Sequence, residues 1–306
     1  MIKAARIFKD YALLWAMLLG AIFHPWLYHL SPILPYNLFL MLTLSYTRIK
    51  PRDLKVKKAH IIMLVVQWLL GIISYLILAP YSAVIAMGVS LIILTPTATA
   101  ASVITYMLGG SIAFVTTFLI ISNVAIALLG PLLISGVSPD IASSYSATVI
   151  RILSQVSLLL LLPLGLVWLL RYKLPKWHEK LAQRSGDTFY IWAFTVLIVS
   201  AKAIHSFRVN DSLTLQYGIL LGFVTFVTTV TLYFIGGRIA KWNGHDVVNG
   251  RQALGQKNTI FAIWLAMAFL PEAVTLIPIF YIIWQNVINS LEISVYKHNA
   301  SQPKEL

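Results

Sequence analysis

Gly255-Gln256-Lys257-Asn258-Thr259 forms a polar interruption in an apolar region near the C-terminus of this chain. Leu94-Thr95-Pro96-Thr97 interrupts an earlier apolar region, and small and hydroxylated residues follow it. Proline removes a backbone donor and clashes with the preceding helical turn. The two stretches therefore predict breaks in two helices that would otherwise be continuous. The alternative is that Pro96 only kinks a helix and that 255–258 is an ordinary loop.

The regions around these breaks predict an all-α integral membrane protein. Of the 306 residues, 59% are hydrophobic and only 11% are charged, and the mean hydropathy is +0.82. A soluble domain carries about 25% charged residues. Apolar runs of about 20 residues, the length of a spanning helix, recur along the whole chain. No polar stretch is long enough for a separate soluble domain.

Ten spans are expected, and the basic loops give their orientation. The spans are predicted over residues 11–30, 33–49, 59–78, 83 onward with the break at 95–96, 112–135, 146–170, 189–204, 215–235, after 243 with the break at 255–258, and 273–291. Lysine and arginine gather after the second, sixth, eighth and tenth spans. Positive loops stay in the cytoplasm, so both termini are expected there, in a bacterial inner membrane. The net charge of +13 is attributed to the basic residues of these cytoplasmic loops, and no nucleic acid is expected as a partner.

The ten spans divide into two halves of five. An odd number per half makes the second half enter from the opposite side, which gives an inverted repeat of the kind found in secondary transporters. The fourth span of each half carries the break. Non-helical backbone at membrane depth survives only where it is buried in protein or lines a cavity. A binding site is therefore expected where the breaks meet, with helix N-termini available to an anion.

Four segments resemble the bile acid:sodium symporter family. They are, in chain order, Tyr46-Thr47-Arg48-Ile49-Lys50-Pro51-Arg52-Asp53-Leu54, Pro96 through Tyr106, Gly255-Gln256-Lys257-Asn258-Thr259 and Trp284-Gln285-Asn286-Val287-Ile288-Asn289-Ser290. The resemblance implies a panel domain of about 11–49 and 146–204, and a core domain of about 59–135 and 215–291. It also implies that the broken helices cross in the core, and that the chain transports organic anions by alternating access.

The chain departs from that family at its sodium sites. Non-ligating or altered residues stand at positions where the resemblance implies sodium ligands: Ala101, Ser102, Val115, Leu119, Ala253 and Lys257. Only Gln67 keeps a matching ligand type. All ten acids, Glu292 among them, are expected in loops or near helix ends, where they can neither bind sodium nor relay a proton. Sodium-independent transport is therefore expected.

Lys257 is the informative residue, because a lysine at membrane depth is costly and marks function by default. Its ammonium could replace the lost sodium ion, with Gln67 and Gln256 completing the surrogate site. It could instead pair with an anionic substrate, or lose its proton on burial and couple transport to protons. The structural alternative is that it snorkels to the cytoplasmic edge. The tethered cation is favoured because its position matches a sodium-site residue.

Thr99, Ser102, Asn258 and Asn286 are the candidate substrate-binding residues, although hydrogen bonding between helices would suit them equally well. The chain has no cysteine, no glycine-rich phosphate loop and no hydrolase or zinc motif, so neither an enzyme, a cofactor nor a metal site is expected. The expected partners are a small organic solute and membrane lipid. The alternative function is a transport-inactive sensor or scaffold. Substrate, coupling and oligomeric state stay open.

Overall fold

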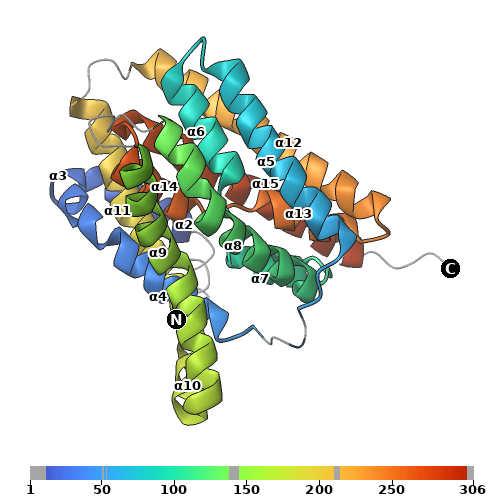
Figure 1. Ribbon diagram of the computed structural model, residues 1–306. Coiled ribbons are helices and arrows are strands. Elements are labelled where there is room, and N and C mark those ends of the chain that lie inside the picture. Colours follow the sequence, from blue (N-terminus) through green and yellow to red (C-terminus); the bar gives the residue numbers. More distant parts are fainter. Residues whose placement is uncertain (1–11, 50–51, 53, 138–144, 210–213, 302–306) are drawn as a thin grey trace.

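The computed structural model describes residues 12–49, 52, 54–137, 145–209 and 214–301, and within these ranges the chain is built of helices (Figure 1). Among these described residues, seven helical stretches are long and apolar enough to cross a membrane. Two shorter apolar helices, Ala83–Leu94 and Thr259–Phe269, lie next to the two expected breaks. The chain is therefore an all-α protein of the multi-pass membrane class.

The described elements, in chain order, are α2 (Ala12–Ile22), α3 (His24–Leu27), the 3-10 helix η1 (Tyr28–Ile33), α4 (Leu34–Tyr46), α5 (Lys58–Leu78), α6 (Ala83–Leu94), α7 (Ala100–Met107), α8 (Ile112–Val137), α9 (Tyr145–Lys173), α10 (Pro175–Gln183), η3 (Arg184–Asp187), α11 (Thr188–Val209), α12 (Leu215–Trp242), α13 (Val247–Gly255), α14 (Thr259–Phe269), η4 (Glu272–Thr275) and α15 (Leu276–Ser301). The predicted breaks fall between α6 and α7 and between α13 and α14.

Local sequence explains several helix ends. The hydroxyl of Ser82 caps α6 by accepting a hydrogen bond from Ile85 N at 3.3 Å. The carboxylate of Asp246 caps α13 in the same way, at 2.8 Å from Val248 N. Such caps satisfy backbone donors that have no partner inside the helix. The six-residue stretch that includes Pro32 is 3-10 rather than α-helical, so the first predicted span is less regular than expected.

The C-terminal helix differs most from its prediction. The expected span over 273–291 begins with the short η4, and α15 then continues to Ser301. Glu292 consequently lies well inside α15, and its side chain is only 13% exposed. The expectation that every acid lies in a loop or near a helix end is therefore wrong for Glu292. The hydropathy pattern fails there because polar residues follow the apolar run without any helix-breaking residue.

The helices pack in two groups that lie side by side in Figure 1. In one group α11 contacts α2, α3 and α4, and α4 contacts α9. In the other, α5, α6, α12 and α15 run alongside one another, and α13 lies against α12. Gly236 and Gly250 make the contact between α12 and α13 very close, because a Cβ on either would overlap the carbonyl oxygen of the other. α10 continues from α9 and projects from the body.

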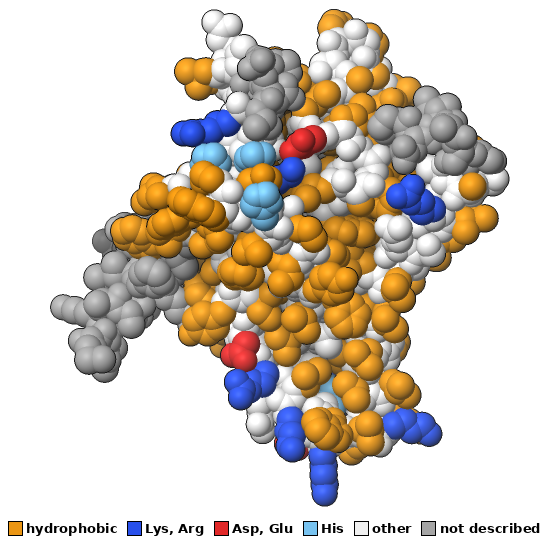
Figure 2. All heavy atoms as spheres, turned by 90° about the vertical axis from the view of Figure 1, so that its left-hand side faces the viewer, with side chains coloured by type: hydrophobic (Ala, Val, Ile, Leu, Met, Phe, Trp, Pro, Cys, Tyr) orange, Lys and Arg blue, Asp and Glu red, His pale blue; other side chains and the backbone are white. Residues whose placement is uncertain are grey.

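The surface suits a membrane environment. Figure 2 shows hydrophobic side chains over the middle of one face, with charged side chains near its two ends. Large apolar side chains such as Leu76, Leu158 and Phe223 are more than half exposed. Water would oppose this exposure, whereas lipid accepts it.

Candidate functional site

The two helix breaks cross and pair through their backbones. Thr97 and Lys257 form an isolated antiparallel bridge. On either side of it, Ala98 N donates to Gln256 O at 2.9 Å and Asn258 N donates to Pro96 O at 2.8 Å. Each break therefore satisfies backbone groups of the other, as non-helical backbone away from water requires.

Pro96 and its neighbours explain why α6 ends where it does. The residue before a proline is pushed toward extended conformation, and Thr95 has φ −53° and ψ 137°. The Thr97 hydroxyl donates to Ala253 O at 2.6 Å, which ties the first break to the last turn of α13. The Tyr281 hydroxyl donates to Gly255 O at 2.6 Å from α15. The carbonyls at the end of α13 are thus hydrogen-bonded to side chains from two other segments.

The side chain of Lys257 is fully buried at this crossing, with 0% exposure. Its Nζ donates to Ile93 O at 2.8 Å and to Thr95 O at 3.0 Å. Gln67 Nε2 donates to Leu94 O at 2.9 Å and to Thr95 O at 3.1 Å. Three consecutive carbonyls at the C-terminal end of α6, which have no intrahelical donor, are therefore satisfied by two side chains.

The surroundings of this amino group contain dipoles rather than counter-charges. A helix C-terminus carries a partial negative charge, and cations are stabilised there. Within the described ranges, the carboxylates that form ion pairs are Asp187, Glu272 and Glu292, and none of them pairs with Lys257. Gln67 Oε1 is buried without a hydrogen-bond partner beside the same carbonyls. The arrangement is one that can hold a monovalent cation on protein oxygens.

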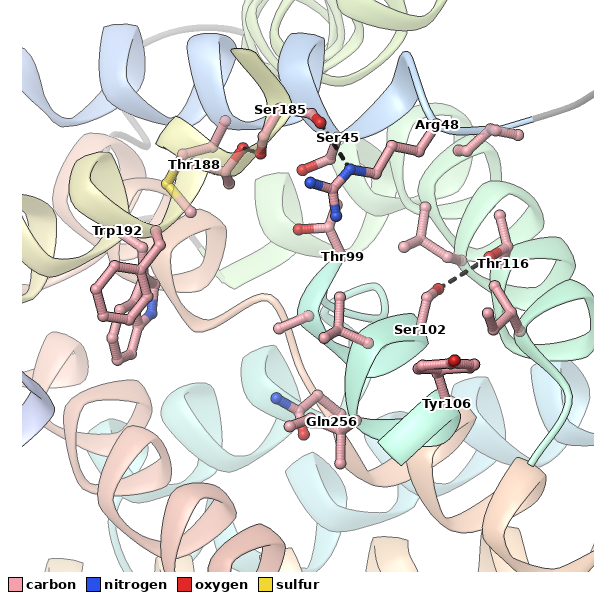
Figure 3. Close-up of a pocket in the computed structure, with 18 of the residues that line it drawn as sticks. Ser45, Arg48, Thr99, Ser102, Tyr106, Thr116, Ser185, Thr188, Trp192 and Gln256 are labelled. Carbon is pink, nitrogen blue, oxygen red and sulfur yellow. Dashed lines mark hydrogen bonds between the residues drawn. The ribbon is translucent and has the colours of Figure 1, made fainter. Parts of the chain in front are cut away.

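A cavity of about 950 Å³ adjoins the crossing. Its lining comes from α4, η3 and α11 on one side and from α7, α8 and α15 on the other (Figure 3). Three of the four predicted substrate-binding residues line it: Thr99, Ser102 and Asn286. The Ser102 and Thr116 hydroxyls lie 2.9 Å apart within it. A volume of this size suits a small organic molecule.

No family model matches this chain, and no curated protein matches it either. Any assignment of function therefore depends on the site itself.

Two predicted site residues make contacts other than those expected from their predicted roles. Asn258 does not line the cavity; its side chain caps α14 by accepting from Phe261 N at 3.2 Å. Gln256 lines the cavity and takes part in a different cluster from Lys257, accepting from Tyr233 OH at 3.3 Å and from Asn289 Nδ2. Of the three residues predicted for the cation surrogate, the structure brings together Lys257 and Gln67.

The hydrogen-bonded cluster that contains Gln256 extends to the carboxylate of Glu292, which was predicted to lie near a helix end. Gln252 Nε2 donates to Asn289 Oδ1 and to Glu292 Oε2, each at 3.0 Å. Glu292 also forms an ion pair with Arg251 at 3.0 Å. A chain of polar side chains thus joins the cavity wall to a carboxylate held between α13 and α15. A continuous helical pattern through Glu292 was the one sequence signal for it.

Arg48, an exposed residue, is a charged member of the cavity lining that sequence reasoning missed. Its position in a basic loop suggested only a role in orientation, yet its side chain reaches into the cavity. Nε of Arg48 donates to Ser185 Oγ at 2.7 Å. The turn that carries Arg48 is held by Arg171, whose guanidinium donates to the carbonyls of Thr47 and Ile49. No local sequence signal separates this arginine from its basic neighbours.

Proposed function

We propose that this chain is a secondary transporter of a small organic anion, working by alternating access and without sodium. The observation that carries the proposal is the burial of Lys257 with its amino group on the last carbonyls of α6. A lysine at membrane depth costs about 2.5–3.5 kcal/mol on insertion scales, so such residues are rare and functional. In this proposal the group is an ammonium that stands in place of a bound cation.

The contacts of Lys257 favour this role over the others considered. An ammonium at the C-terminal end of a broken helix neutralises carbonyl dipoles as a bound metal cation would. Its side chain is fully buried and is not part of the cavity lining, which argues against direct pairing with a substrate. Because the cation is covalently attached, the crossing stays neutralised whether or not sodium is present. Transport would then be a uniport, an exchange or a proton-linked process.

The cavity supports a transport role because of where it lies. Its lining combines α4, η3 and α11, which belong to the proposed panel of α2 to α4 and α9 to α11, with α7, α8 and α15 of the proposed core, and elsewhere the two groups contact each other directly through α8 and α9. Rocking of one group against the other would change access to this space, as in other transporters with broken helices. Thr99, Ser102 and Asn286 are the proposed substrate contacts there.

The proposal includes a topology of ten crossings in two inverted halves of five, with α6–α7 and α13–α14 each counted as one broken span. It includes membership of the bile acid:sodium symporter family as a divergent member. It also includes cytoplasmic termini in a bacterial inner membrane, on the basis of the basic loops.

Uptake measurements test this function. Small organic anions that stabilise the purified protein against heat would be radiolabelled and offered to proteoliposomes in sodium and in potassium buffers. We expect equal rates in the two buffers and no uptake into protein-free liposomes. A strict sodium requirement would defeat the proposal. Thermal stabilisation by ligands with no flux in either buffer would favour the sensor or scaffold instead.

A further inference from the structure

A chain of three side-chain amides leads from a buried carboxylate to the wall of the cavity. The amides belong to Gln252 on α13, Gln256 at the second helix break and Asn289 on α15, and the carboxylate belongs to Glu292. The three amide residues are 0%, 4% and 4% exposed, so water competes little for their hydrogen bonds. An amide has a donor end and an acceptor end. The way in which each amide is turned therefore depends on the group that it meets.

The donors and acceptors of this chain run in one direction. An ionised carboxylate only accepts, and Gln252 Nε2 donates to Glu292 Oε2 at 3.0 Å. The same nitrogen donates to Asn289 Oδ1 at 3.0 Å, which leaves the Asn289 amide with its nitrogen for the next contact. That nitrogen, Nδ2, donates to Gln256 Oε1. Gln256 is left with Nε2, which makes no hydrogen bond to a described residue, and Gln256 lines the cavity.

Two further residues hold this direction in place. The Tyr233 hydroxyl donates to Gln256 Oε1 at 3.3 Å and to Asn289 Oδ1 at 3.1 Å, so both oxygens are occupied. If the Gln256 amide turned over, its NH2 group would face the NH2 group of Asn289, and Oε1 would lose its two hydrogen bonds. Arg251 Nε lies 3.0 Å from Glu292 Oε1, and this ion pair makes burial of the charged carboxylate tolerable. The carboxylate is therefore the fixed acceptor at the end of the chain.

We propose that Gln256 Nε2 is a hydrogen-bond donor that the cavity offers to its ligand, and that Glu292, as a positioning residue, keeps it turned that way through the two intervening amides. The inference deepens the proposed function and rests on it, because the cavity is the substrate site there. The ligand class is a molecule with an acceptor atom, such as a carbonyl oxygen or an unprotonated aromatic nitrogen, on an apolar body.

The surroundings of Gln256 suit a neutral acceptor. Figure 3 shows Gln256 well apart from Arg48 and Ser185 on the cavity wall. Phe189 and Trp192 line the same cavity and supply aromatic surface for the body of the ligand. A donor group placed against Nε2 would leave two donors facing each other without an acceptor, and burying unpaired donors is costly. Ligands with an acceptor at this point are therefore favoured over ligands of the same shape with a donor.

Calorimetric binding of quinoline and indole to detergent-solubilised, full-length protein tests the inference. The two probes are aromatic bicycles of similar size, and both are uncharged in neutral buffer. Quinoline offers a nitrogen acceptor, whereas indole offers an N–H donor. We expect saturable binding of quinoline that is at least about threefold tighter than that of indole, which corresponds to one neutral hydrogen bond. Equal binding, tighter binding of indole or the absence of saturable quinoline binding overturns the inference.

Gln256→Glu reverses the group that faces the cavity and keeps the contacts behind it. One carboxylate oxygen still accepts from Asn289 Nδ2 and from the Tyr233 hydroxyl, while the other replaces Nε2. The preference is expected to invert, so that indole binds at least about threefold more tightly than quinoline. Gln183→Glu adds the same charge at an exposed position of α10 outside the cavity, and it should keep the preference for quinoline. An unchanged preference in Gln256→Glu overturns the inference.

Glu292→Gln tests the positioning role. Its neutral amide can present either an acceptor or a donor to Gln252, so the chain of amides is no longer held in one direction. The preference for quinoline is expected to fall below about twofold. Glu272→Gln removes a carboxylate that pairs with Lys202 and does not line the cavity, and it should keep the full preference.

The ratio of the two affinities distinguishes positioning from stability. A merely structural loss in Glu292→Gln would weaken both probes alike and leave their ratio unchanged, and that result overturns the positioning role. Because the comparison of quinoline with indole needs only the unmodified protein, it decides the role of Gln256 even if a variant does not fold.

The outcomes separate this inference from the proposed function. A preference for quinoline that depends on Gln256, without uptake of any solute into proteoliposomes, would support the recognition site and defeat the transporter. Sodium-independent uptake by a protein that binds quinoline and indole equally would support the transporter and defeat this inference.

Discussion

Replacement of Lys257 by glutamine tests whether its ammonium stands in for a bound cation. In the unmodified chain Nζ reaches Ile93 O at 2.8 Å and Thr95 O at 3.0 Å. After the replacement, Thr95 O keeps its hydrogen bond from Gln67 Nε2 at 3.1 Å, but Ile93 O loses the side-chain donor that reached it. The vacated space is then bordered by the carbonyl oxygens of Ile93 and Thr95 and by the new amide.

The magnitudes show which measurement is informative. An unsatisfied buried carbonyl costs about 1–3 kcal/mol. Removing a buried ammonium recovers several kcal/mol of hydration, so the net change in stability has no diagnostic sign. The response to small cations is diagnostic. A cation that binds only the folded state, at ten times its Kd, stabilises it by about 1.4 kcal/mol. With an unfolding entropy of about 2.1 cal/mol/K per residue, this raises the melting temperature of a chain this long by about 2 °C.

Thermal melting in sodium, potassium and choline chloride at equal ionic strength measures that response. We expect the melting temperature of the unmodified protein to be the same in all three salts, and that of Lys257→Gln to be about 2 °C higher in sodium or potassium than in choline. Lys241→Gln is the control, because Lys241 is exposed and distant in sequence from the crossing. A sodium-dependent shift in the unmodified protein would refute the reasoning. So would a Lys257→Gln variant that responds no more than the control.

Three further substitutions probe the packing and the site. Gly250→Ala should lower stability by at least about 2 kcal/mol, because its Cβ overlaps a carbonyl of α12, whereas Gly165→Ala, with open space around it, should be near neutral; thermal melting compares the two. Asn258→Ala should cost about 1 kcal/mol in thermal melting through loss of the α14 cap and leave the uptake of small organic anions into proteoliposomes unchanged; slower uptake would place Asn258 at the substrate site. Glu272→Gln should cost less than about 1 kcal/mol in a denaturation series, because the carboxylate of its ion pair with Lys202 is 49% exposed, and a larger loss would contradict surface screening.

The helical class and the two breaks could be predicted from sequence because they depend on local properties. Apolar runs of spanning length have few folds open to them in lipid, since each backbone polar group must be paired within the segment or within protein. Pro96 ends a helix through its own ring and missing donor, and Gly255 to Asn258 is polar enough to interrupt a span. The breaks observed after Leu94 and after Gly255 follow from these residues.

Helix length and side-chain environment were less accessible to sequence reasoning. α15 runs on through Glu292 because nothing in its sequence stops a helix, and the carboxylate is buried by packing against Arg251 and Gln252. Hydropathy registers only the polarity of such a residue. It does not register a partner on another helix that makes burial of the charge tolerable.

The sequence by itself determined an all-α chain of the multi-pass membrane class with two interrupted helices, and it singled out Lys257 as a residue that membrane depth makes costly. Only the tertiary structure decided that this lysine lies on the carbonyls of α6 beside Gln67, that Gln256 belongs to another cluster, and that Arg48 turns into a cavity. The physical reason is how far apart along the chain the interacting groups lie. Helix formation and helix breaking depend on neighbours within a turn, whereas each of these contacts joins side chains to groups on other helices, where packing of the whole chain sets the distance.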